Sequence, residues 1–572
     1  MASRHLLQCP ELLGEIFSNL ELASRPNDVD DTCATKIDRE QREVRKTLTA
    51  AALSCRALTE HALVVLWRRL DSVQPLLSLL SEPKRQSSKP HLTTLQADIT
   101  EQSWRRFQMH ARRVRALHDK DWTGIHPSTW AFVGRWCGPE PLLPNLEELS
   151  VLPLSVQNPT SMIFMSPKLR SLSLALRFDK VAPGCGRLRK GDTVVVNMLF
   201  RQIMSIAPGI KTLSIKSNAS DLPPTCFYRI SDLKDIAVLH ARDCVLDFAF
   251  LRWVGVRPSL HSLAATIDME HLPPRPQDPE DEEYQEYDPF WGGFDEVKHL
   301  DIRGSPNHIH LFLAAAIPCE LQVQTIEFET CAAPAAITRC IDTICNNATT
   351  GCPVLRELTL RYPDETYRDE AAGNSLQRSS LVDVIRPALG LRFLRKVTLD
   401  FHEIPSLADA GILQMIAAWP KLTALHIVPS GSSEQYRTHT KLTPSVLVAL
   451  ARECPRLVEL TLPEVALRDV RETETDMPFV GQRALRKLRV YFRDWGRDHV
   501  LYTAALFIDR LFPCLDLSPS FEEEEDDGSY DGLSWEERGK EAEKTWRRVE
   551  EFLYAMQLGR RHRAALKDAE EP

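Results

Sequence analysis

The stretch Leu457-Val458-Glu459-Leu460-Thr461-Leu462 contains the pattern that decides the fold: apolar, two residues, apolar, one residue, apolar. Side chains of an extended strand alternate between two faces, so Leu460 and Leu462 face one side while Glu459 and Thr461 face the other. The same spacing occurs twelve times along the chain. The copies begin at Leu146, Leu169, Ile210, Ile236, Leu260, Val297, Val323, Leu355, Leu394, Leu422, Leu457 and Leu485.

This recurring pattern resembles the core of the leucine-rich repeat. The shorter steps between copies, 23 to 28 residues, fit one repeat unit, and the longer steps imply inserted helices or loops. Helical patterns lie between copies at residues 376–389, 407–418 and 445–452. A strand followed by a helix at this period predicts an α/β solenoid, with a curved parallel sheet inside and helices outside.

The outward-facing strand residues form the expected concave surface of the solenoid, which is the default place for a target protein to bind. Most of these residues are small or polar, so any one of them could instead be merely solvated. The candidate target-binding residues are Glu148, Ser171, Thr212, Glu357, Thr359, Glu459 and Thr461.

The N-terminal segment predicts three short amphipathic helices. Pro10 suits the first position of a helix, because its missing N–H costs nothing there. Apolar residues then follow at helical spacing from Leu12 to Leu20 and form one stripe. Three such helices cannot bury all their apolar faces against one another. Some of this surface must therefore meet a partner or the solenoid that follows.

Three short motifs in this segment resemble an F-box of the kind that opens fungal F-box proteins with leucine-rich repeats. They are Pro10-Glu11-Leu12-Leu13 with Ile16-Phe17 and Leu20, then Leu53, Cys55-Arg56 and Leu58, and then Leu66-Trp67-Arg68-Arg69-Leu70. The chain departs from the family in the stretch at about residues 21–43, a loop insertion longer than the usual connection. An insertion at a loop tip is tolerated if the helices still meet.

The F-box resemblance implies docking on the Skp adaptor protein and, through that adaptor, on the cullin of a ubiquitin ligase. The alternative is that the same residues only pack a cap on the solenoid. The residues that the resemblance assigns to adaptor binding are Pro10, Leu12, Leu13, Ile16, Phe17, Leu20, Cys55, Leu58 and Trp67.

The bulk composition restricts the partners and the compartment. The 572 residues carry a formal net charge of −9, which argues against nucleic acid as the main partner. No apolar run is long enough to span a membrane, and the N-terminus lacks a signal-peptide pattern. We therefore expect an intracellular protein, in the cytoplasm, the nucleus or both, with its 14 cysteines reduced.

The sequence contains no constellation that predicts an enzyme, a cofactor site or a metal site. Gly186 and Gly191 have phosphate-loop spacing, but Asp192 follows where that loop needs lysine. His308 and His310 have no third ligand near them in sequence, and no C-x-x-C pair supports a zinc site.

Four segments are expected along the chain. Residues 1–80 are an F-box-like helical domain, and residues 81–140 are a helical linker or cap. Residues 141–515 are the solenoid, with an acidic loop at about 273–291. Residues 516–572 are an acidic linker and a charged helix. Two hypotheses follow: a substrate receptor of a Skp–cullin–F-box ubiquitin ligase, or a repeat scaffold with an N-terminal cap that never joins a ligase.

Overall fold

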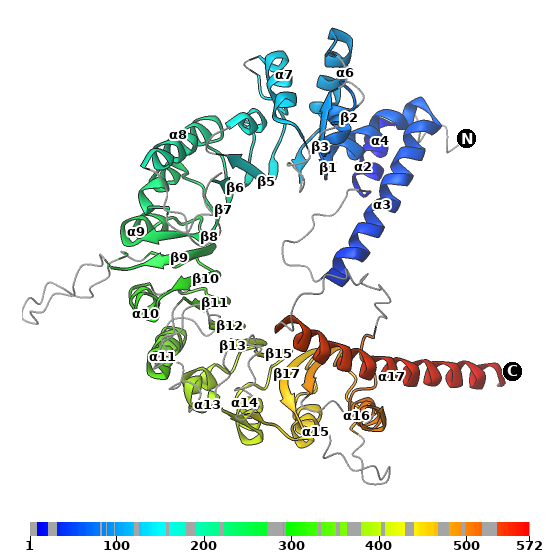
Figure 1. Cartoon of the computed structure of the whole chain (residues 1–572), viewed down its shortest axis with the longest axis vertical. Helices are drawn as coiled ribbons and strands as arrows, with labels where there is room; N and C mark the ends of the chain where they lie inside the picture. The colour runs from blue at the N-terminus through cyan, green and yellow to red at the C-terminus, as the bar shows by residue number, and fades with distance from the viewer. Residues whose placement is uncertain are drawn as a thin grey trace, which may run out of the picture. The chain divides into compact units, whose positions relative to one another are not determined.

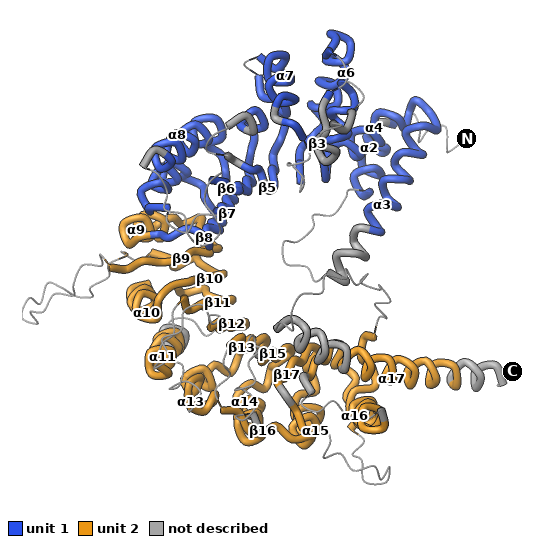
Figure 2. The backbone as a smooth tube through the Cα atoms, in the orientation of Figure 1, with its two compact units in different colours: residues 1–246 blue, residues 247–572 orange. Residues whose placement is uncertain are grey.

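The computed structural model divides into two compact units, residues 1–246 and 247–572 (Figure 2). Both acidic stretches, near residues 278–288 and 522–527, lie outside the residues that the structure describes. The described residues are 9–20, 31–80, 83–86, 89–95, 98–118, 125–138, 140–155, 159–178, 190–217, 222–270, 290, 293–316, 318–329, 333–350, 355–362, 379–401, 406–429, 440–466, 480–492, 498–517 and 535–570.

Parallel strands in chain order form the sheet of the first unit. In order, they are β1 (Arg69–Leu70), β4 (Ala116–Leu117), β5 (Glu148–Ser155), β6 (Ser171–Arg177), β7 (Thr212–Ser217) and β8 (Val238–Asp247). A separate antiparallel pair joins β2 (Pro83–Gln86) to β3 (Lys89–Leu95).

The second unit repeats this topology, and each strand again pairs in parallel with the next. In order, they are β9 (Ser262–Asp268), β10 (His299–Gly304), β11 (Val323–Phe328), β12 (Glu357–Tyr362), β13 (Lys396–Phe401), β15 (Ala424–Pro429), β17 (Glu459–Val465) and β18 (Lys487–Phe492). A small parallel pair joins β14 (Leu407–Ala408) to β16 (Thr440–Lys441).

Within each unit, the helices that follow the strands lie on the outer side of the sheet (Figure 1). In the first unit these are α6 (Glu101–Ala111), α7 (Pro127–Cys137) and α8 (Lys190–Ile206). In the second they are α9 (Phe248–Gly255), α10 (Pro306–Ala315), α11 (Pro334–Thr350), α13 (Leu381–Val384), α14 (Asp409–Ala418), α15 (Pro444–Glu453) and α16 (Asp498–Leu511). Strand followed by helix, with an all-parallel sheet, confirms the predicted α/β leucine-rich-repeat-like solenoid.

The repeated apolar residues form the core between sheet and helices, with two corrections to the predicted pattern. In the first copy Leu152, not Val151, pairs with the core position Leu174, because a bulge between Leu149 and Leu152 adds a residue to β5. The copy predicted to begin at Val323 is also displaced. Val323 is opposite Glu357 in the register and is half-buried, whereas buried Leu321 takes the first core position.

The second correction has a simple chemical cause. Gln324 is opposite the core residue Leu358, and its side chain is fully buried. A polar residue therefore occupies a core position. Because the apolar spacing cannot include Gln324, its match begins at Val323, two residues after Leu321. The structure also adds β1 and β4 at the start of the sheet. Each has two residues, too few to show the full spacing, and β4 lies within the expected helical linker or cap at 81–140.

The last helix, α17 (Trp535–Glu570), packs against α16 and β18 in the second unit. Trp546, Val549 and Leu553 are buried, and the Gln557 amide donates a hydrogen bond to the Leu515 carbonyl oxygen at 3.0 Å. This helix covers the last strand of the ladder, as a terminal cap must.

Candidate interaction surfaces

Three helices form the N-terminal module: α2 (Pro10–Ser18), α3 (Asp31–Ser54) and α4 (Arg56–Arg68). Pro10 stands at the first turn of α2 and Glu11 beside it, where a negative side chain complements the positive end of the helix. Helix α4 contacts both other helices. A small core of Phe17, Leu48, Ala62 and Val65 joins all three.

The predicted loop at about residues 21–43 is shorter than expected, because α3 already begins at Asp31. Its first turns lack an apolar stripe, so the sequence there indicated a loop. Charged pairs one turn apart, such as Arg39 and Glu43 with 3.8 Å between Nε and Oε1, are compatible with a solvated helix.

The apolar stripe of α2 is divided between the inside and the outside of the module. Leu13 and Phe17 are 3% and 5% exposed, and they face the other helices. Leu12 and Ile16 are 48% and 45% exposed. Because Leu12 and Ile16 are four residues apart, they lie on the same side of the helix, one turn above the other. Half of the stripe holds the module together, and half is left uncovered.

The other residues assigned to adaptor binding differ in their environment. Leu20 and Leu58 are partly buried against the module core. Cys55 caps the start of α4 and is half-buried. Trp67 packs on His110 of α6, with 4.4 Å between ring centroids. The side chain of Pro10 lies outside the described residues.

Two exposed apolar residues were missed by the sequence reasoning: Leu53 at the end of α3 and Val64 on α4. Leu53 lies within the quoted motifs and is 83% exposed, whereas Cys55 and Leu58 of the same motif are half-buried. The module therefore has exposed apolar residues on α3 and α4 as well as on α2.

The module is attached to the first strands of its unit by polar contacts. Both Glu60 carboxylate oxygens accept hydrogen bonds from Nη2 of Arg113, at 2.7 and 2.8 Å. Arg45 forms an ion pair with Asp71, directly after β1. The module therefore also covers the beginning of the sheet.

On the sheet of the first unit, the candidate target-binding residues Glu148, Ser171 and Thr212 share one register row. Glu148 is already engaged within the chain. Its carboxylate lies 3.0 Å from Nη2 of Arg69 and 3.6 Å from Nε2 of His118. The adjacent His118 imidazole, together with Arg69, lowers the pKa of the Glu148 carboxyl.

The second unit repeats this arrangement on different strands. Glu357 and Glu459 share one register row, and Thr359 and Thr461 share the next. His426 Nε2 lies 3.4 Å from the Glu459 carboxylate, and His426 Nδ1 lies 3.0 Å from the Thr461 hydroxyl. In both units a histidine thus contacts a glutamate and a hydroxyl of the next strand, since His118 Nδ1 also lies 2.7 Å from the Ser150 hydroxyl. Each glutamate also has a cation as ion-pair partner, Arg69 for Glu148 and Lys487 for Glu459.

Acidification should weaken the fold through three histidines, of which His110 is buried and His310 and His426 are half-buried. Burial lowers the pKa of His426, although Glu459 opposes that effect, and burial also lowers the pKa values of His110 and His310. Below about pH 6.5 the unfolded chain then binds more protons than the folded chain, so the free energy of unfolding falls. Melting temperatures measured at pH 7.5 and 5.5 should show the decrease.

A matched pair of variants isolates the contribution of His426. His426→Gln should reduce the loss of melting temperature between pH 7.5 and 5.5. His562→Gln changes an exposed side chain on α17 and should leave the loss as it is in the wild type. An identical pH dependence in wild type and His426→Gln would contradict this assignment.

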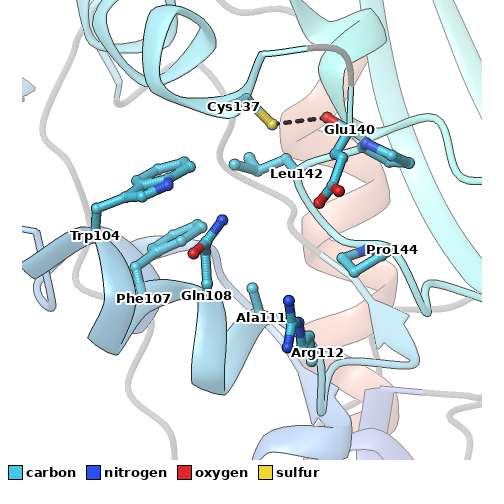
Figure 3. A pocket seen from close by; sticks show the side chains of 10 residues that line it. Trp104, Phe107, Gln108, Ala111, Arg112, Cys137, Glu140, Leu142 and Pro144 are labelled. Carbon is cyan, nitrogen blue, oxygen red and sulfur yellow. Dashed lines mark hydrogen bonds between the residues drawn. The ribbon is translucent and has the colours of Figure 1, made fainter. Parts of the chain in front are cut away.

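A small pocket lies between α6 and the segment that follows α7 (Figure 3). Trp104, Phe107 and Leu142 line it, and the Cys137 thiol donates a hydrogen bond to the Glu140 carbonyl oxygen at 2.9 Å. Its volume of about 20 Å³ is room for roughly one water molecule. A pocket of this size does not fit a substrate or a cofactor.

Within the described part of the chain, no three His, Cys, Asp or Glu side chains lie close enough together to hold a metal ion. Burial raises the pKa of Cys226 and Cys454 to about 11, and that of Cys340 and Cys345 to about 12. These thiols stay protonated and unreactive at neutral pH. None of the described helices is both long and apolar enough to cross a membrane.

No protein-family model matches the sequence, and no curated protein matches it. The chain is similar to a chain in the crystal structure of the yeast Rad7–Elc1 complex, with 14% identity, a TM-score of 0.33 and coverage of 86% of this chain and 92% of that one. It is also similar to an internalin (inlF) from Listeria monocytogenes str. 4b F2365, with 11% identity, a TM-score of 0.26 and coverage of 62% and 82%.

Both TM-scores are below 0.5, so neither similarity supports a conclusion about activity or partners. The class of the protein follows from its own strand order and register: a leucine-rich-repeat-like solenoid with a three-helix N-terminal module.

Proposed function

We propose that this protein is the substrate-recognition subunit of a Skp–cullin–F-box ubiquitin ligase. The N-terminal module binds the Skp adaptor and, through it, the cullin, while the repeats hold a target protein inside the cell, in the cytoplasm or the nucleus. The chain itself performs no bond chemistry. It increases the effective concentration of a target lysine beside the ubiquitin carrier.

One observation carries this proposal: Leu12 and Ile16 stay exposed while Leu13 and Phe17 of the same stripe are buried. Exposed apolar side chains at helical spacing are suited to a groove of a partner protein, where removing them from water supplies binding energy. Because Phe17 belongs to the module core and Leu13 is buried, the contact surface proposed here is the exposed half of the α2 stripe, Leu12 and Ile16.

The test is a binding measurement between the purified chain and a purified Skp adaptor. Leu12→Asp combined with Ile16→Asp should weaken adaptor binding at least about tenfold, because charged side chains would enter an apolar contact. Both side chains are exposed, so the melting temperature should change little.

Helix α8 offers a matched control, since Val194 and Met198 are also exposed and four residues apart. Val194→Asp combined with Met198→Asp should leave adaptor binding as it is in the wild type. Unchanged adaptor binding in the Leu12→Asp/Ile16→Asp variant would refute the proposed docking face.

A repeat scaffold that never joins a ligase is the second candidate. It is supported by the contacts of the module with α6 and the turn after it, through Glu60–Arg113 and Trp67–His110. Deleting residues 1–68 removes the three helices and keeps β1. If the module only caps the sheet, its deletion should strongly lower the melting temperature. If it is a separate adaptor-binding module, its deletion should leave the repeats folded.

A further inference from the structure

Five exposed cations gather where three neighbouring strands of the second unit begin. Arg356 precedes β12, Arg392 and Arg395 precede β13, Lys396 begins β13, and Lys421 lies before β15. We call these five residues the basic edge. Glu357 is opposite Lys396 in the register, so this edge carries five positive charges against one negative charge. The whole chain, in contrast, has a net charge of −9.

Backbone hydrogen bonds hold the basic edge in a regular order. The Arg395 and Lys396 N–H groups donate to the Arg356 carbonyl oxygen at 2.7 and 3.0 Å, and the Thr423 N–H donates to the Arg395 carbonyl oxygen at 2.7 Å. The backbones of Arg356 and Arg395 are therefore one strand spacing apart, about 4.8 Å. Their backbone positions are set by the sheet before any partner arrives.

The side chains of Arg356, Arg392, Arg395 and Lys396 have no ion pair or hydrogen bond with another residue in the part of the chain that the structure describes. Lys421 lies over the ring of Phe393, with 4.3 Å between its Nζ and the ring centroid. Phe393 itself is 48% exposed. Neighbouring cations that have no acidic partner among the described residues keep a local positive potential, and a partner of opposite charge can use it.

We propose that the basic edge binds an acidic segment of a partner protein, with an apolar side chain of that segment packing on Phe393. This inference deepens the proposed receptor function, on which it rests, by naming the chemistry of the target. An extended acidic peptide can place carboxylates opposite successive guanidinium groups, which bind them with paired hydrogen bonds. The exposed ring between the cations gives a contact that charge alone does not supply.

A nucleic acid is the rival anionic partner, and one feature favours a peptide. Lys421 already covers one face of the Phe393 ring, where a base would otherwise stack.

The experiment is fluorescence anisotropy of a labelled peptide, six glutamates around a central leucine, titrated with the full chain. Arg356→Glu combined with Arg395→Glu should weaken binding at least about tenfold, and raising the salt should weaken wild-type binding. Arg561→Glu combined with Arg563→Glu gives the same charge change on exposed residues of α17 and should leave binding within about twofold. A peptide with alanine for the leucine should bind more weakly.

Three results would overturn the proposal. The first is equal peptide binding by the basic-edge variant and the α17 variant. The second is a single-stranded oligonucleotide of equal charge that binds the edge more tightly than the peptide. The third is a tenfold gain of peptide affinity when the chain's own carboxylates at 522–527 are replaced by amides. That gain would mean that the acidic run of this chain, and not a partner protein, occupies the basic edge.

The test separates this inference from the adaptor function. The Leu12→Asp/Ile16→Asp variant should bind the peptide as the wild type does, because its changes lie in the other unit. Loss of adaptor binding without loss of peptide binding would support the two surfaces independently. Melting temperatures of the variants check that they are folded. The substituted side chains on the basic edge, on α2 and on α17 are exposed.

Discussion

Replacing Trp419 by alanine should lower the free energy of unfolding by about 3–5 kcal/mol. Trp419 follows α14, is 0% exposed, and is among the largest fully buried side chains. Its indole N–H donates a hydrogen bond to the Ala388 carbonyl oxygen at 3.1 Å, which joins it to the 3₁₀ turn Arg386–Gly390. Alanine would leave a cavity and would remove this hydrogen bond, while the Ala388 oxygen would still accept from the Leu391 N–H at 3.1 Å.

Two further variants separate these effects in urea unfolding followed by circular dichroism. Trp419→Phe keeps a six-membered aromatic ring but loses the N–H and part of the ring volume, so it should cost about 1–3 kcal/mol. Leu413→Ala on the same helix changes an exposed side chain and should cost less than about 1 kcal/mol. A Trp419→Ala protein as stable as the Leu413→Ala protein would contradict the packing described for this turn.

Replacing Gln324 by leucine should raise the free energy of unfolding by about 1–3 kcal/mol. Neither the nitrogen nor the oxygen of the Gln324 amide has a hydrogen-bond partner in the described structure, although the side chain is fully buried. The register places it between Leu300 on β10 and Leu358 on β12. Leucine would remove the desolvation cost of the amide and continue the apolar row.

The same chemical change two residues earlier is the control. Gln322 is half-buried at the start of β11, and Gln322→Leu should change the free energy of unfolding by less than about 0.5 kcal/mol. Urea unfolding of both variants measures the difference. A Gln324→Leu protein that is less stable than the wild type would mean that the amide is satisfied in solution.

The apolar spacing was sufficient to predict the repeats and the parallel sheet, because each strand must bury one face against its neighbours. Leu169, Leu172 and Leu174, for example, are all buried as expected. The same spacing failed at Gln324 and at the bulge before Leu152. A periodic pattern has no means of detecting a polar residue in a core position or an extra residue in a strand.

The candidate surfaces could be predicted only in part. The N-terminal motifs indicated which residues are apolar, but the exposure of Leu12 and the burial of Leu13 depend on how α2 packs on α4. Glu148 and Glu459 were predicted to be available, yet each lies beside a histidine on the preceding strand. Such contacts join residues tens of positions apart in the chain.

The repeat period and the alternation within each strand are local properties, so the residues alone specify them. Other features depend on the register between strands and on the packing between helices. They are the face of a helix that stays open, the carboxylates that meet a partner on the next strand, and the place where cations gather. Arg356, Arg395 and Lys421 are ordinary surface residues in the sequence. They become one charged edge because parallel strands place their starting residues side by side.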